Sequence, residues 1–202
     1  MRVDTPVIAD TPQPARDARR LLVGLAAILF PALYVLSDIM ELLAGGLYTA
    51  QLWVTYLGEA AVPFFVVGLD AYQQPRSGLL GFVGAVAYGA SFVGFCATVL
   101  YPLVTGVRDA DQVFAAFGPI YTAHAGLALV GGLMFGVAAL RARVYPAWTG
   151  LAIIAGLLLS LLLIGLDLPE AVQTSGTALR SAGFLGMGIA CLRMPTRVMV
   201  PT

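Results

Sequence analysis

Glu59 lies near the middle of an apolar run, Trp53 to Phe65 (WVTYLGEAAVPFF), that is suited to the interior of a lipid bilayer. A charge at that depth costs roughly 3 kcal/mol on insertion scales unless it is paired, hydrated or neutral. This carboxyl group is therefore a candidate proton donor or acceptor. Pro63 has no N–H, so the carbonyl of Glu59 loses its helical donor and we expect a kink at this point.

Other polar side chains recur at helical spacing along the neighbouring apolar segments. Residues three or four apart share one face of a helix, so each set forms a polar stripe. We predict that the stripes face one another across a cavity, because polar groups facing lipid would be unsatisfied. The stripes comprise Tyr34, Asp38 and Glu41; Thr55, Tyr56 and Glu59; Ser91, Thr98 and Tyr101; Tyr121 and His124; and Glu170, Gln173, Thr177 and Arg180.

This set predicts acid–base chemistry on a lipophilic substrate. Glu59, kept protonated by apolar surroundings, would be the catalytic acid, and His124 or Tyr121 would orient the substrate or relay the proton. Arg180 would bind an anionic or carbonyl group of the substrate. The remaining expected substrate-binding residues are Tyr56, Asp38, Glu41, Tyr101, Gln173 and Thr177.

Structural interpretations of the same residues stay open. Arg180 and Glu59 can form an ion pair that joins two helices, which would keep the carboxylate ionised and remove it as an acid. His124 is the only histidine, and it can equally be a hydrogen-bonded core residue. We expect no metal and no cofactor, because the sequence has no Cys/His metal spacing and no glycine-rich phosphate loop.

Composition predicts an integral membrane protein. The chain has 202 residues, of which 59% are hydrophobic and 11% charged, whereas soluble domains have about 25% charged residues. The formal net charge is zero, so we expect no nucleic-acid partner. Six apolar segments each approach the roughly 20 residues that cross a bilayer, and they cover residues 21–43, 50–70, 78–103, 113–140, 147–166 and 170–192.

We therefore predict an all-α bundle of six transmembrane helices in the plasma membrane. Arginines gather on one side of the predicted bundle, which places both termini in the cytoplasm and the cavity mouth on the other side. Residues 1–18 are polar and contain three prolines, which predicts a disordered tail. The membrane domain then covers 19–193, and 194–202 forms a short second tail.

Glycines recur on the third, fourth and sixth segments, and Gly132 and Gly136 form a GxxxG pair. Small residues let helices approach closely. The pattern predicts close packing inside the bundle, and a homodimer through the glycine-rich helices is the alternative.

Two stretches carry a resemblance to known proteins. The run Ser37 to Gln73 (SDIMELLAGGLYTAQLWVTYLGEAAVPFFVVGLDAYQ) and the run Ala85 to Phe95 (AVAYGASFVGF) resemble a family of small actinobacterial multi-pass membrane proteins of unassigned function. This resemblance supports the helix count and implies no activity. In overall plan, the chain is similar to the fungal integral-membrane terpene cyclases, because it has one acid on the second helix and another late in the chain. Those have seven helices, and no motif matches residue by residue, so the similarity is an analogy.

Three functions are compatible with the sequence. The first is a membrane-embedded enzyme acting by acid–base chemistry on an isoprenoid- or lipid-like substrate. The second is a small solute or proton-coupled transporter. The scarcity of polar groups on the inner half of the bundle counts against a complete transport path. The third is a non-catalytic membrane subunit whose polar stripes only join helices.

Overall fold

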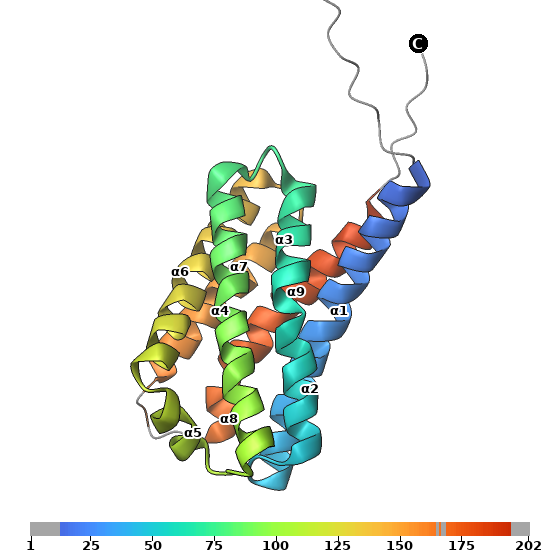
Figure 1. The fold of residues 1–202 in the computed structure, drawn as a ribbon. Helices are drawn as coiled ribbons and strands as arrows, with labels where there is room; N and C mark the ends of the chain where they lie inside the picture. Colours follow the sequence, from blue (N-terminus) through green and yellow to red (C-terminus); the bar gives the residue numbers. More distant parts are fainter. Residues whose placement is uncertain (1–12, 165, 167–168, 195–202) are drawn as a thin grey trace, which may run out of the picture.

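The computed structural model describes residues 13–164, 166 and 169–194 (Figure 1). Within these residues the chain is all-α, as predicted, and contains no strand. The helices are α1 (Gln13–Ala44), α2 (Thr49–Ala60), α3 (Val62–Gln73), α4 (Gly78–Thr105), α5 (Ala110–Phe117), α6 (Pro119–Ala142), α7 (Ala147–Leu163), α8 (Glu170–Gln173) and α9 (Ser175–Arg193).

Four helical stretches are long and apolar enough to cross a membrane: Ala18–Ala44, Thr49–Gln73, Gly78–Thr105 and Pro119–Ala142. The second of these combines α2 and α3, and α7 is a shorter apolar helix of 17 residues. Many large apolar side chains on these helices are exposed, among them Phe64, which is 78% exposed. Exposed apolar surface on this scale is typical of a face that contacts lipid. The helices are therefore compatible with a membrane bundle.

The long helices lie side by side (Figure 1). α4 packs mainly on α6 and α3, while α9 packs between α1 and α7. The beginning of α1, the end of α9 and the α3–α4 connection lie at one end of the bundle, which we call the α3–α4 end. The α1–α2 connection, α5 and α8 lie at the opposite end, which we call the α5 end.

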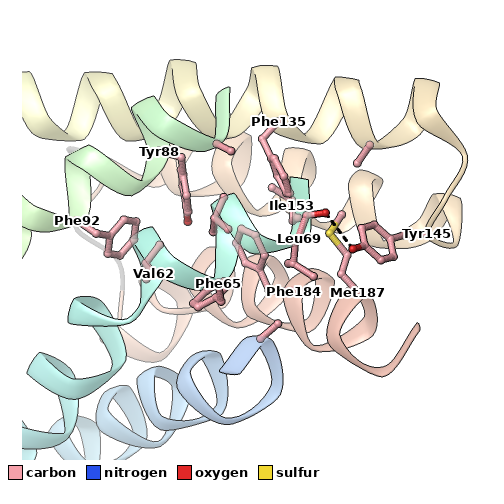
Figure 2. Close-up of a cluster of buried hydrophobic side chains, with 14 of the residues drawn as sticks. Val62, Phe65, Leu69, Tyr88, Phe92, Phe135, Tyr145, Ile153, Phe184 and Met187 are labelled. Atoms are coloured by element: carbon pink, nitrogen blue, oxygen red, sulfur yellow. Dashed lines mark hydrogen bonds between the residues drawn. The ribbon is translucent and has the colours of Figure 1, made fainter. Parts of the chain in front are cut away.

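An aromatic and aliphatic core fills the bundle toward the α3–α4 end (Figure 2). Three aromatic rings surround the ring of Phe184. Measured between ring centroids, Phe65 lies 5.4 Å away, Tyr88 lies 5.7 Å away, and Phe135 stacks on Phe184 at 6.0 Å. The hydroxyl of Tyr145 donates to the carbonyl of Leu69 at 3.0 Å. Helices α3, α4, α6 and α9 are thus held together by ring contacts and one buried hydrogen bond.

The second apolar segment is interrupted where the kink was expected. α2 ends at Ala60, and α3 begins at Val62 with Pro63 in its first turn. The carbonyl of Glu59, which has no donor at Pro63, accepts instead from the N–H of Ala61. The proline therefore separates two helical pieces of one apolar stretch directly after Glu59.

Two predicted helices differ from the observed ones. The prediction of one helix over 113–140 is wrong, because α5 ends at Phe117 and α6 begins at Pro119. Proline disfavours a helical conformation of the preceding residue, and Gly118 takes φ 46° and ψ −123° there. The segment predicted over 170–192 is divided into α8 and α9.

The predicted tails are only partly described. α1 begins at Gln13, so the helix includes the last residues of the predicted tail 1–18. Residues 1–12 and 195–202, the rest of the two predicted tails, lie outside the described part of the chain.

The glycines allow helices of the same chain to approach closely. A Cβ atom on Gly84 would lie 2.5 Å from the backbone nitrogen of Phe135, and one on Gly131 would lie 2.5 Å from that of Tyr88. α4 and α6 therefore meet backbone to backbone. The GxxxG pair also faces this chain: Gly132 contacts Leu157 and Tyr88, and Gly136 contacts Ile154.

Candidate functional site

A cavity of about 600 Å³ lies toward the α5 end of the bundle, and we call it the main cavity. Its lining residues come from α1, α2, α4, α5, α6, α7 and α9. The polar ones are Tyr34, Asp38, Glu41, Gln51, Thr55, Glu59, Thr98, Tyr121, Thr122, Ser160, Thr177 and Arg180, and aliphatic and aromatic side chains form the remainder. Ligand sites in proteins typically have volumes of about 300–1,000 Å³ and combine apolar walls with a few polar groups.

Glu59 is the most buried acid of the main cavity, and its side chain is 4% exposed. Its Oε1 atom accepts from the hydroxyl of Tyr34 at 3.5 Å, and its Oε2 atom has no hydrogen-bond partner. The last turn of α2 holds this side chain, directly before the break at Ala61. A buried carboxyl oxygen without a partner costs free energy, so this position is suited to exchange a proton or hydrogen bond with a bound molecule.

Gln51 organises a polar network between α1 and α2 and is 2% exposed. Its Nε2 atom lies 3.1 Å from Oγ of Ser37, 3.1 Å from Oε2 of Glu41 and 3.0 Å from Oγ1 of Thr55. The hydroxyls of Ser37 and Thr55 also bond to each other, while Oε1 of Gln51 has no partner. The sequence interpretation missed Gln51, although its spacing of four residues from Thr55 and eight from Glu59 was a usable signal.

Arg180 lines the main cavity from α9, whereas Glu59 lines it from α2. Its guanidinium carbon lies 6.0 Å from the centre of the Phe92 ring, at the outer limit of a cation–π contact. Close packing of α9 on α7 positions it, because a Cβ atom on Gly156 would lie 2.6 Å from the backbone nitrogen of Arg180. The contacts described for Arg180 and Glu59 include no ion pair between them.

Aromatic rings form a continuous wall of the main cavity, which we call the aromatic wall. Consecutive ring centroids along it lie 6.4, 5.3, 5.6 and 4.8 Å apart. The rings belong, in order, to Tyr34, Phe92, Phe95, Tyr121 and Phe114. The wall therefore leads from the residue that contacts Glu59 to α5.

α5 lies beside the main cavity and contributes Ala110, Val113 and Phe114 to its lining. Its N-terminus is capped by Asp109, whose Oδ1 accepts from the backbone N–H groups of Asp111 at 2.9 Å and Gln112 at 3.3 Å. This cap explains the acid at position 109 by helix formation.

The structure brings six of the predicted site residues together and places three elsewhere. Glu59, Tyr121, Asp38, Glu41, Thr177 and Arg180 line the main cavity. His124, Tyr56 and Tyr101 are not among its lining residues. The side chain of Gln173, like that of Glu170, lies outside the described part of the chain.

Other contacts account for the three displaced side chains. His124 lies against α4, where a Cβ atom on Gly94 would come within 2.1 Å of its Nε2 atom. Tyr56 packs edge-on against Trp53 at 5.9 Å, and Tyr101 packs against Phe117 at 5.7 Å. These contacts favour a packing role for the three residues.

A second buried acid, Asp70, lies in the last turn of α3 and is 2% exposed. Its Oδ2 atom accepts from Nε2 of Gln74 at 2.8 Å, and its Oδ1 atom lies against Gly81 in the first turns of α4. An acid near a helix N-terminus is stabilised by the helix dipole. We therefore interpret Asp70 as a structural residue.

Over the described residues, no group of three or more His, Cys, Asp or Glu side chains is arranged to hold a metal ion. Comparison with protein-family models, with curated proteins and with solved structures found no match for this chain.

Proposed function

We propose that this chain is a multi-pass membrane enzyme that acts by acid–base chemistry on a lipophilic substrate held in the main cavity. One observation carries the proposal: Glu59, buried and with Oε2 unpartnered, shares a single cavity with Arg180 and an otherwise largely apolar lining. Such a cavity suits a molecule with an apolar body and one polar reacting group.

Glu59 would transfer the proton. Its Oε1 atom accepts from the hydroxyl of Tyr34, whereas its Oε2 atom has no partner and is enclosed by protein, so the carboxyl group would turn toward the cavity to meet a bound substrate. A proton given by Glu59 to the substrate is regained when the product loses one, so an isomerisation or cyclisation is balanced without net proton transfer. Tyr121 lines the same cavity and is the better relay candidate, since His124 packs against α4.

The packing of the opposite half favours an enzyme over a transporter. A transported solute would have to pass from the main cavity to the α3–α4 end. That half is filled by buried residues, including Phe65, Tyr88 and Phe135, which are each at most 2% exposed. A site closed on one side is what an enzyme working from one membrane face requires.

The proposal includes a placement in the plasma membrane. α7 and α9 would complete six spans with the four longer stretches. Arg76 and Arg143 lie in the α3–α4 and α6–α7 connections, and Arg141 lies in the last turn of α6. The excess of arginine would place this end in the cytoplasm. The main cavity would then open to the non-cytoplasmic side.

The test compares the purified protein with Glu59→Gln and with Asp111→Asn, which makes the same chemical change at an exposed position outside the cavity. Each protein, in non-ionic detergent, is incubated with a lipid extract of the source membranes. Mass spectrometry then follows the species consumed and formed.

We expect turnover by the wild type and by Asp111→Asn, and a loss of about 100-fold or more in Glu59→Gln, the usual scale for removing a general acid or base. Size-exclusion profiles and melting temperatures check that each variant is folded. Equal turnover by a folded Glu59→Gln protein would overturn the proposal.

A further inference from the structure

We propose that the main cavity selects a lipophilic cation, an amine or onium compound with an aromatic or alkyl body, as its ligand. This inference rests on the proposed function, because it names the substrate class of the same cavity. Three features of the lining carry it: an excess of acids, the aromatic wall, and hydrogen-bond acceptors without donors.

The charges of the lining favour a cation. Asp38, Glu41 and Glu59 line the main cavity, and the described lining contains one basic residue, Arg180. The acids therefore exceed the bases by two formal charges, and an excess of one remains if Glu59 carries a proton. Apolar walls strengthen the attraction of this charge for a ligand, because they lower the local dielectric constant.

The aromatic wall lies in the same cavity as these acids. The face of an aromatic ring carries negative electrostatic potential and attracts cations within about 6 Å of its centre. Arg180 already uses the wall in this way, since its guanidinium carbon lies 6.0 Å from the centre of the Phe92 ring. Phe95, Tyr121 and Phe114 continue the wall toward α5. They offer further ring surface to a second cation.

Two buried oxygens of the lining have no hydrogen-bond partner: Oε2 of Glu59 and Oε1 of Gln51. Both side chains are more than nine-tenths buried, being 4% and 2% exposed. An amide oxygen can only accept, and an ionised carboxylate also only accepts. Both atoms are enclosed by protein, so a ligand would meet either one only after its side chain turns toward the cavity. A protonated amine would then supply a donor to that oxygen, whereas an anion could not pair with the amide oxygen of Gln51.

The test uses two probe ions of nearly the same size and shape and of opposite charge, tetraphenylphosphonium and tetraphenylborate. Binding of each ion to the purified protein is measured by equilibrium dialysis in non-ionic detergent. Comparing variants with the wild type for one ion cancels its partitioning into detergent. The variants are Glu59→Gln, Asp38→Asn and Arg180→Gln, and Asp111→Asn is the control outside the cavity.

We expect tetraphenylphosphonium to bind the wild type and the Asp111→Asn control equally. Its affinity should fall about ten-fold in Asp38→Asn and rise several-fold in Arg180→Gln, as expected for removing one charge near a bound ion. Glu59→Gln should change it little, because the protonated acid of the proposed function carries no charge. Tetraphenylborate should respond in the opposite direction.

Tetraphenylborate binding that is stronger, and that is lost in Arg180→Gln, would overturn cation selection and leave the proposed enzyme intact. An affinity for the phosphonium ion that does not change in Asp38→Asn would also overturn it, as would the absence of binding by either ion. Failure of the proposed function has a separate readout, the turnover of the lipid extract by Glu59→Gln.

Discussion

The hydroxyl of Tyr34 on α1 lies 3.5 Å from Oε1 of Glu59 on α2 and is the one hydrogen-bond partner described for that carboxyl group. This distance is longer than the roughly 2.5–3.0 Å that is usual for an O–H donor. The contact therefore orients the acid more than it stabilises the fold. It also connects Glu59 to the aromatic wall, of which Tyr34 is the first ring.

Replacing Tyr34 with Phe tests this orientation. The ring and its packing on Phe92 are kept, while the hydroxyl is removed. We expect the free energy of unfolding to fall by less than about 1 kcal/mol, since the bond is long, and turnover of the substrate to fall about ten-fold because the carboxyl group is no longer held. Thermal melts and the lipid assay measure the two effects. A large loss of stability with unchanged turnover would contradict an orienting role.

A second prediction concerns Gly94 and His124. A Cβ atom on Gly94 would lie 2.0 Å from Cδ2 of His124, which is too close for the imidazole to keep its position between the two helices. We expect Gly94→Ala to destabilise the protein by about 1–3 kcal/mol, the usual cost of overpacking. The melting temperature in detergent measures it.

Matched variants separate this clash from a general effect of alanine. Gly126 lies on α6, and a Cβ atom there would have nothing within 4 Å, so Gly126→Ala should be neutral or slightly stabilising. Adding His124→Ala to Gly94→Ala should recover much of the lost stability, because it removes the colliding ring. If the double variant melts no higher than Gly94→Ala, the imidazole is not the obstacle.

A third prediction distinguishes bundle packing from dimerisation. Gly136 contacts Ile154 and lies 3.4 Å, measured from its ideal Cβ position, from the carbonyl oxygen of Gly150 on α7. Gly136→Ile should therefore lower the melting temperature without changing the oligomeric state. Light scattering coupled to size-exclusion chromatography measures the molecular mass. A change from dimer to monomer at an unchanged melting temperature would instead support the homodimer through the glycine-rich helices.

The fourth prediction concerns orientation in the membrane. Single cysteines are introduced as Arg76→Cys, in the α3–α4 connection, and as Asp111→Cys, on α5, after both native cysteines have been replaced by alanine. A membrane-impermeant maleimide added to intact cells should label the cysteine at 111 and not the one at 76. Opening the cells should expose both. The reverse pattern would place the main cavity on the cytoplasmic side.

Elements of the bundle that depend on local chemistry could be predicted from sequence. Glu59 stands out because an acid in an apolar run is costly, and Pro63 predicts the break because it lacks an N–H. The same local chemistry, at Gly118 and Pro119, separates α5 from α6. The prediction of one continuous helix gave too little weight to this proline and the glycine before it.

The membership of the candidate site depended on tertiary structure. Helical spacing placed His124 and Tyr121 on one face, yet only Tyr121 reaches the main cavity. The difference arises because Gly94 leaves room on α4 for the imidazole. The spacing of residues within α6 carries no information about the surface of the helix that faces it.

The sequence by itself determined that the chain is helical and apolar, that Glu59 is an exceptional acid, and that a break follows it, because each depends on one residue and its neighbours along the chain. Only the tertiary structure decided that Arg180 lies over Phe92 and that Gln51 bonds across to α1. These contacts join residues far apart in sequence, and the rotation of each helix about its own axis, set by the glycine contacts between helices, selects them.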